Sequence, residues 1–380
     1  MNLNSASAVN GSSEAEGGVK TVNLALQGGG SHGAYAWGLL EALAGDPRIE
    51  IGAISGASAG AINAVLYASG LAAGGREGAR AKLKQFWLSV STEGSLAPAQ
   101  RKLLSAWLGP WAGAWPGTQL LAAWGEAISQ FVSPYAFNPF NINPLRCHLE
   151  AAVDFERLRA GDRVKLFVAA TNVRTGRGEI FRREILTVDH VMASACLPQL
   201  FQAVEIGREA YWDGGFAGNP PLWPLFYETR CRDTIIVQIN PIEREEIPRT
   251  PEDISNRVDE ITFNASLLAE LRAADFVARL IRSGVLESED YRLERLHRIG
   301  GAGRLECYPA STKFNVSWPF LCELRDLGRE DTKAWLDQNF DAIGVESTLD
   351  IDRALKREPA KDAISKRRRE PASRPPLTGS

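Results

Sequence analysis

The chain has 380 residues, of which 44% are hydrophobic and 23% are charged, and its net charge at pH 7 is −3. These values suit a globular protein with a sizeable core, and the near-neutral charge gives no basis for general nucleic-acid binding. Five cysteines without C-x-x-C spacing indicate reduced, mostly buried thiols and a cytoplasmic location. Four scattered histidines with no H-x-x-x-H pair predict no metal site.

The two ends of the chain differ in composition from the part between them. Residues 1–19 are mostly Ser, Gly, Ala, Asn and Glu without an apolar segment, which indicates a flexible leader and no Sec signal peptide. From Arg353 to Ser380, nine basic residues stand against three acidic ones, with four prolines. This composition predicts a basic disordered tail over residues 351–380, with binding to anionic lipid as the alternative.

Between the ends, patterns of strand and helix alternate. Short apolar runs that predict strands are Val22–Leu26, Ile51–Ile54, Leu166–Ala170, Ala203–Ile206 and Thr234–Ile239. Helical patterns at Ala34–Leu43 and at residues 59–69 follow the first two runs. Because the runs are apolar on both faces, we expect an α/β fold whose mainly parallel central sheet is covered by helices on both faces.

A long helix is predicted to open at residues 250–261. Thr250 can cap its N-terminus, and Pro251 takes the first helical position. The side chain of Asp253 can hydrogen-bond back to the capping residue. One apolar stripe, of the kind that packs on a core, continues through Ile254, Val258, Ile261, Ala265 and Leu268. We therefore expect residues 241–350 to form a helical C-terminal region packed on the preceding domain.

An uncharged, Trp-rich segment breaks the alternating pattern. The 23 residues from Leu103 to Gly125 carry four tryptophans and no charge. They are long enough to span a bilayer, but Pro110, Pro116 and several glycines interrupt them. Two interpretations of this insertion (about 98–140) remain equal: an apolar element packed on the core, or a lid or membrane-facing cap over an apolar pocket.

Two glycine-rich blocks follow the first two predicted strands. The first, 28-GGGSHG-33, has the spacing of a dinucleotide fingerprint, which requires an acidic residue at the end of the second strand. That strand ends instead in 56-GASAG-60, the G-x-S-x-G pattern of a nucleophile elbow between a strand and a helix. Ser58 would sit on a strained turn whose neighbours exclude side chains at both flanking glycines. The first block is then better explained as backbone N–H groups that hold an oxyanion.

The candidate general base is an aspartate. His297 is the one histidine after residue 190, and its charged surroundings at 292–300 predict a surface helix residue. Asp213 precedes two glycines in 211-YWDGGFAGNPP-221, which places a carboxylate on a tight turn and makes it the stronger candidate.

These blocks resemble those of the bacterial patatin-like phospholipases. The matching blocks, in order, are 28-GGGSHG-33, 56-GASAG-60, 193-ASACLPQLF-201 and 213-DGG-215. The resemblance covers about residues 20–240 and implies a patatin-like catalytic domain that cleaves lipid acyl esters without a cofactor. It departs from the family at His32, where an Arg or Lys is usual.

Carried over residue by residue, the resemblance implies a role for ten positions. Ser58 would be the nucleophile, Asp213 the general base, and Gly28, Gly29 and Gly30 the oxyanion hole. Supporting motif positions would be Gly33, Gly56, Gly60, Gly214 and Gly215. The substrate would be a lipid, with peripheral membrane contact; the alternatives are another apolar ester, such as a storage polyester or thioester, or a non-catalytic lipid-binding protein.

Overall fold

A computed structural model describes residues 18–91, 133–244, 246–286, 291–300, 303–308 and 310–355. Nearly all of the expected leader lies outside these residues, as do the four tryptophans of the Trp-rich insertion and the basic tail beyond Leu355. No helix in the described part of the chain combines the length and apolar character that a membrane crossing requires.

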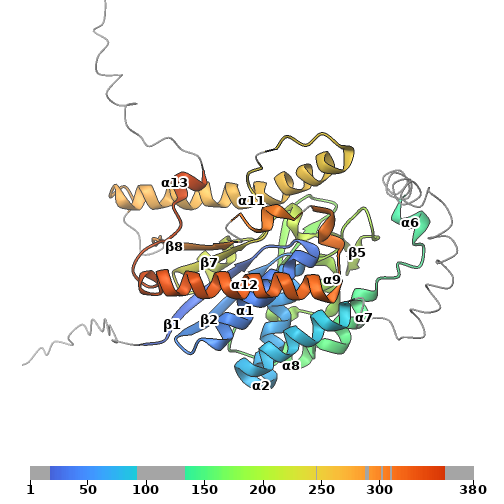
Figure 1. Ribbon diagram of the computed structural model, residues 1–380, viewed down its shortest axis with the longest axis horizontal. Helices are drawn as coiled ribbons and strands as arrows, with labels where there is room; N and C mark the ends of the chain where they lie inside the picture. Colours follow the sequence, from blue (N-terminus) through green and yellow to red (C-terminus); the bar gives the residue numbers. More distant parts are fainter. Residues whose placement is uncertain are drawn as a thin grey trace, which may run out of the picture.

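An eight-stranded sheet forms the centre of the molecule (Figure 1). Its strands are β1 Lys20–Leu26, β2 Ile49–Gly56, β3 Lys165–Asn172, β4 Gly178–Arg182, β5 Val204–Ile206, β6 Glu209–Asp213, β7 Asp233–Gln238 and β8 Arg295–Gly300. The order is β5-β6-β3-β2-β1-β7-β8, with β4 also paired to β3. The pairings of β1, β2, β3, β7 and β8 with one another are parallel, and those of β4, β5 and β6 are antiparallel. The prediction of a mainly parallel sheet is confirmed.

Helices cover both faces of this sheet. They are α1 Gly33–Gly45, α2 Ala59–Val90, α6 Pro134–Phe137, α7 Pro144–Ala152, α8 Phe155–Ala160, α9 Val188–Ser194, α10 Trp223–Glu228, α11 Pro251–Arg282, α12 Trp318–Asn339 and α13 Ile351–Ala354. Successive strand residues point to opposite faces, so Leu24 belongs to the larger core cluster and Ala25 to the smaller one. The larger cluster includes side chains of α1, α2 and α12, and the smaller one side chains of α11.

The C-terminal region is part of the same core. A Cβ added to Gly38 of α1 would lie 1.8 Å from the carbonyl oxygen of Arg325, and one added to Gly328 of α12 would lie 2.0 Å from that of Tyr35. The two helices therefore touch backbone to backbone where only glycine fits. The region that the sequence predicts to be helical also contributes β8, which extends the sheet beside β7 (Figure 1).

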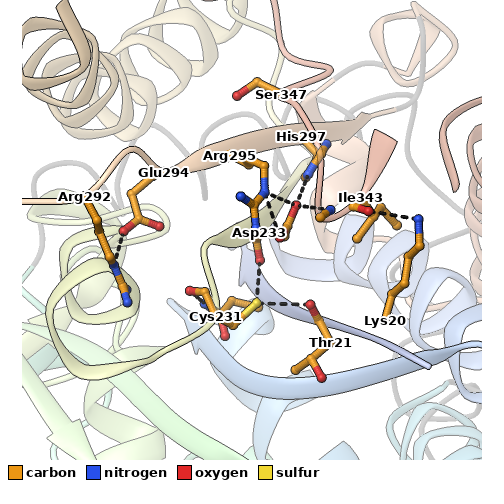
Figure 2. Close-up of polar contacts among 12 residues, drawn as sticks. Lys20, Thr21, Cys231, Asp233, Arg292, Glu294, Arg295, His297, Ile343 and Ser347 are labelled. Atoms are coloured by element: carbon orange, nitrogen blue, oxygen red, sulfur yellow. Dashed lines mark hydrogen bonds and ion pairs between the residues drawn. The ribbon is translucent and has the colours of Figure 1, made fainter. Parts of the chain in front are cut away.

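The prediction for His297 is wrong. His297 lies on β8 and is fully buried, with its Nε2 3.1 Å from Asp233 Oδ1 and its Nδ1 3.0 Å from Thr348 Oγ1. Figure 2 shows the Asp233 carboxylate between His297 and Arg295, whose guanidinium lies 2.7 Å from Asp233 Oδ2. The charges in this run suggested an exposed helix because the sequence does not show that a neighbouring strand neutralises Arg295.

The long helix begins as expected, but its apolar stripe does not face the core. Thr250 caps α11 by accepting a hydrogen bond from the backbone N–H of Asp253 at 3.1 Å. Ile254, Val258 and Ile261 are 47%, 55% and 54% exposed. The inner side of α11 instead combines apolar and polar residues. Leu267 and Leu271 are buried in the smaller core cluster, and Asn264 donates a hydrogen bond to the carbonyl oxygen of Pro241 at 2.9 Å.

Candidate active site

Ser58 occupies a sharp turn between β2 and α2. Its backbone has φ 53° and ψ −127°, in the left-handed region that a serine rarely adopts. The turn is held by the Ser58 N–H, which lies 3.1 Å from the carbonyl oxygen and 3.0 Å from the hydroxyl oxygen of Ser194. The turn presents the serine at the N-terminus of α2, where the helix dipole favours negative charge.

The two glycines that flank Ser58 leave no room for a side chain. A Cβ on Gly56 would lie 2.6 Å from the carbonyl carbon of Gly60, and one on Gly60 would lie 2.2 Å from the carbonyl oxygen of Leu26. The G-x-S-x-G spacing therefore reflects a close approach of β1, β2 and α2.

Asp213 ends β6 and is completely buried. In the sheet, Asp213 lies opposite Ala170 of β3. Val168, two residues before Ala170 on the same strand, lies opposite Gly56 at the end of β2. The backbone N–H of Asp213 donates to the carbonyl oxygen of Cys196 at 2.8 Å. The block 193-ASACLPQLF-201 thus binds both turns: Ser194 holds the Ser58 turn, and Cys196 holds Asp213.

The Asp213 carboxyl group is only partly satisfied. Its Oδ1 accepts a hydrogen bond from the Gly215 N–H at 2.7 Å, whereas its Oδ2 is buried and has no hydrogen-bond partner among the described residues. Burial raises the pKa of Asp213 from 3.8 to about 7, and the Gly215 N–H and the nearby Ser58 side chain lower the pKa in part. The Ser58 hydroxyl is thus a neighbour of the carboxyl group, although no hydrogen bond of ordinary geometry joins them.

The glycine loop after β1 lies against the serine. A Cβ on Gly28 would be 2.5 Å from Ser58 Cβ, so the loop and the elbow touch. The Gly28 N–H is already engaged, because it donates to Asn219 Oδ1 at 2.6 Å. In the described part of the chain, no group accepts a hydrogen bond from the N–H of Gly29 or Gly30. The sequence grouped the three glycines together. Within the described residues, the Gly28 N–H is engaged by Asn219, whereas the N–H groups of Gly29 and Gly30 are not engaged.

The buried amide side chains of Gln27 and Asn240 hold this loop in place. Gln27 accepts from the backbone N–H groups of Ile239 and Asn240 at 2.8 and 2.9 Å, and it donates to Asn264 of α11 at 3.1 Å. Asn240 follows β7 and donates from Nδ2 to the Gly28 carbonyl oxygen at 2.7 Å. Motif reading missed these amides because Gln and Asn carry no distinctive spacing, and only the packing of α11 on the ends of β1 and β7 brings residues 27, 240 and 264 together.

His32 is uncharged at neutral pH. Burial lowers the pKa of His32 to about 4, assisted by the positive charges of Lys313 and Arg244. Its Nε2 lies 2.8 Å from Thr312 Oγ1, and it makes no hydrogen bond to Ser58 or Asp213. His297 contacts Asp233 at the start of β7, whereas Ser58 follows the end of β2, so the two lie at opposite ends of the parallel strands. Throughout the described residues, no group of three His, Cys, Asp or Glu side chains is arranged to bind a metal.

A family comparison decides the classification. The sequence profile of the family described as patatin-like phospholipase matches residues 24–226, which include the glycine loop, the Ser58 turn and Asp213. This chain belongs to the patatin-like phospholipase family. No curated protein matches the chain.

Among solved structures, the crystal structure of VipD from Legionella pneumophila is similar to this patatin-like chain. The two share 17% sequence identity with a TM-score of 0.35. The alignment covers 80% of this chain and 66% of that one, so this patatin-like chain spans slightly less than two thirds of VipD's length.

Proposed function

We propose that this protein is a serine acyl hydrolase that cleaves carboxylic esters of lipids with a Ser58–Asp213 dyad. One observation carries the proposal: a buried carboxylate oxygen without a hydrogen-bond partner, on Asp213, next to a serine on a strained strand–helix turn. A pKa of about 7 keeps a large fraction of Asp213 ionised at neutral pH and makes it a much better base than a free aspartate.

The proposed reaction uses these residues in two half-reactions. Ser58 Oγ attacks the ester carbonyl carbon while its proton passes to Asp213 Oδ2. The carbonyl oxygen becomes negative and is stabilised by the N–H groups of Gly29 and Gly30, with Gly28 joining if it releases Asn219. When the tetrahedral intermediate collapses, the alcohol leaves with the proton from Asp213, and the acyl group remains on Ser58.

Water completes the cycle. Asp213 takes a proton from a water molecule that attacks the acyl–serine carbonyl carbon. The second tetrahedral intermediate collapses to release the carboxylic acid, and the proton returns from Asp213 to Ser58 Oγ. No cofactor enters this scheme.

We infer that the exposed side of α11 contacts the surface of aggregated lipid. Phe263 of α11 lies against the Asp213 turn, since a Cβ on Gly215 would be 3.2 Å from its ring. The outer side of the same helix exposes Ile254, Val258 and Ile261. An exposed apolar surface beside a site for lipid substrates suits contact with a lipid–water boundary.

The test of the proposed reaction is labelling with a fluorophosphonate probe and identification of the modified peptide. Wild type should be labelled at Ser58 and Ser58→Ala should not be labelled. Ser69→Ala, which alters a buried serine on the same helix, is the matched control and should label like wild type. Labelling of Ser58→Ala at the wild-type level would refute the assignment. A panel of phospholipid, thioester and polyester substrates then separates the substrate classes.

A further inference from the structure

Lys313 is a partly buried cation that lies beside the glycine loop. It belongs to the short segment Ala310–Phe314, whose backbone presses on the loop: a Cβ on Gly30 would lie 2.5 Å from the Lys313 carbonyl oxygen. Burial lowers the pKa of Lys313. Even partial burial of an ammonium group is costly unless the group has a function or a full set of partners.

Its partners are incomplete. To the residues that the structure describes, the ammonium group donates one hydrogen bond, to Asn240 Oδ1 at 2.8 Å, although it has three donor hydrogens. Among the described residues, no carboxylate lies within ion-pair distance of Lys313. Glu260, a buried acid of α11 whose charge acts on Lys313, is already paired with Arg244 at 2.7 Å and with Arg257 at 3.1 Å. Asp259 influences Lys313 only at longer range.

The hydrogen bond to Asn240 is the first step of a chain that ends at the candidate oxyanion hole. Lys313 donates to Asn240 Oδ1, and Asn240 Nδ2 donates to the Gly28 carbonyl oxygen at 2.7 Å. That carbonyl oxygen and the Gly29 N–H belong to one peptide group. Consecutive hydrogen bonds polarise one another, so a positive charge at one end makes the N–H at the other end a stronger donor.

We propose that Lys313 is a positioning residue of the oxyanion hole, which acts through Asn240 to orient and polarise the Gly28–Gly29 peptide. The inference rests on the function proposed above, because it needs an oxyanion to stabilise. The charge matters most when the carbonyl oxygen of the substrate becomes negative, so Lys313 should affect the transition state more than substrate binding.

The experiment uses the full chain and a short, water-soluble ester, so that contact with a lipid surface plays no part. Three variants are compared: Lys313→Met removes the charge and the donor, Lys313→Gln keeps a donor, and Lys313→Arg keeps both. Lys82→Met is the matched control, because Lys82 is also partly buried, has a lowered pKa and donates to a backbone carbonyl oxygen, that of Ala152. For each variant we would measure kcat, KM, the melting temperature and the inhibition constant of a boronic acid, which forms a negative tetrahedral adduct on the serine.

Lys313→Met should lower kcat about 10- to 100-fold, less than the 10²- to 10³-fold typical for loss of a direct oxyanion donor. KM should stay near the wild-type value, boronic acid inhibition should weaken by the same factor as kcat, and Lys313→Arg should be closest to wild type. An unchanged kcat would overturn the proposal, as would a loss confined to KM and the melting temperature. If the Met variant does not fold, the Gln variant decides by the same criteria.

These outcomes are distinct from failure of the proposed function. If wild type neither hydrolyses esters nor labels at Ser58, the dyad itself is refuted. If wild type is active, Ser58→Ala is inactive, and the Lys313 variants match wild type, only the role of Lys313 is refuted.

Discussion

Asp213 is subject to two opposing effects: a base must be ionised, and burial disfavours the ionised form. As the proposed base, Asp213 must be ionised, yet it is fully buried and only one of its oxygens is hydrogen-bonded to a described residue. Burial raises the pKa of Asp213 to about 7, which strengthens it as a base but makes its charged form costly in the folded state. Both consequences can be measured at this one residue.

The first consequence concerns the rate. Ester hydrolysis should increase with pH and level off above an apparent pKa of about 7, because only ionised Asp213 accepts the serine proton. Asp213→Asn keeps the size of the side chain but removes the proton acceptor, and it should lower kcat/KM by about 10³-fold or more. The pH–rate profile on a soluble ester checks both statements. A wild-type profile without a step between pH 5 and 8 would contradict the assignment of the base.

The second consequence concerns stability. The folded-state pKa of Asp213 is raised above its unfolded value, so its favourable contribution is complete below about pH 4 and is lost as pH rises through about 7. Asp213→Asn should therefore be more stable than wild type at pH 8, by up to about 4 kcal/mol for a shift of roughly three pKa units. The two proteins should converge near pH 4. Urea denaturation at both pH values provides the comparison, and a variant less stable than wild type at pH 8 would count against the buried-charge argument.

Among the structural elements, the strand–helix elbow depends on a close approach that only glycine permits. A Cβ on Gly60 would lie 2.2 Å from the Leu26 carbonyl oxygen, whereas nothing lies within 4 Å of a Cβ on Gly45 at the end of α1. Gly60→Ala should destabilise the protein by about 2 kcal/mol or more and abolish probe labelling at Ser58, because the turn must shift. Gly45→Ala should change the free energy of unfolding by no more than about 0.5 kcal/mol. Equal stability of the two variants would show that the elbow tolerates a side chain.

The exposed stripe of α11 has an effect that depends on the form of the substrate. Replacing Val258 and Ile261 with Ser should weaken binding to phospholipid vesicles and slow hydrolysis of vesicle lipid several-fold. Hydrolysis of a soluble short-chain ester should be unchanged, because neither side chain touches the dyad. Vesicle sedimentation and the ratio of the two rates measure the effect. If both rates fell together with the melting temperature, the stripe would have a structural role instead.

In the molecule as a whole, the candidate site lies at one end of the sheet, and a cluster of structural ion pairs and hydrogen bonds lies at the other. One end carries the candidate dyad and glycine loop. At the other, Asp233 is held by His297, Arg295 and the Gly344 N–H, which ties β7, β8 and the segment after α12 together (Figure 2). Burial by itself would raise the pKa of Asp233, but these hydrogen bonds hold it well below its usual value.

His297→Ala should therefore reduce stability without altering the chemistry. It leaves a buried carboxylate short of one hydrogen bond and opens a cavity, which together should cost about 2–4 kcal/mol of unfolding free energy. The kcat of the folded fraction should match wild type. Denaturation curves and kinetics below the melting transition check this, and a large loss of kcat in fully folded protein would argue for a histidine in the reaction.

Local sequence signals predicted the elements whose pattern is complete within a few residues. The five apolar runs became β1, β2, β3, β5 and β7, and Thr250 caps α11. The strands β4, β6 and β8 were missed, because they mix charged and apolar residues and are stabilised by the strands beside them. The orientation of α11 was also missed, since its inner side contains polar residues such as Asn264 beside the buried Leu267 and Leu271.

By itself, the sequence determined the family, the α/β class and the candidate dyad and glycine loop. These depend on glycines whose positions are dictated by contacts within a few residues, as at the Ser58 turn, and such contacts leave a readable spacing. Only the tertiary structure showed that Gly28 is already engaged by Asn219, that Asn240 and Lys313 support the loop, and that His297 is buried far from the serine. These contacts join residues that are up to about three hundred positions apart in the sequence. The role of a buried charge or amide depends on such distant partners, and no local sequence pattern reveals them.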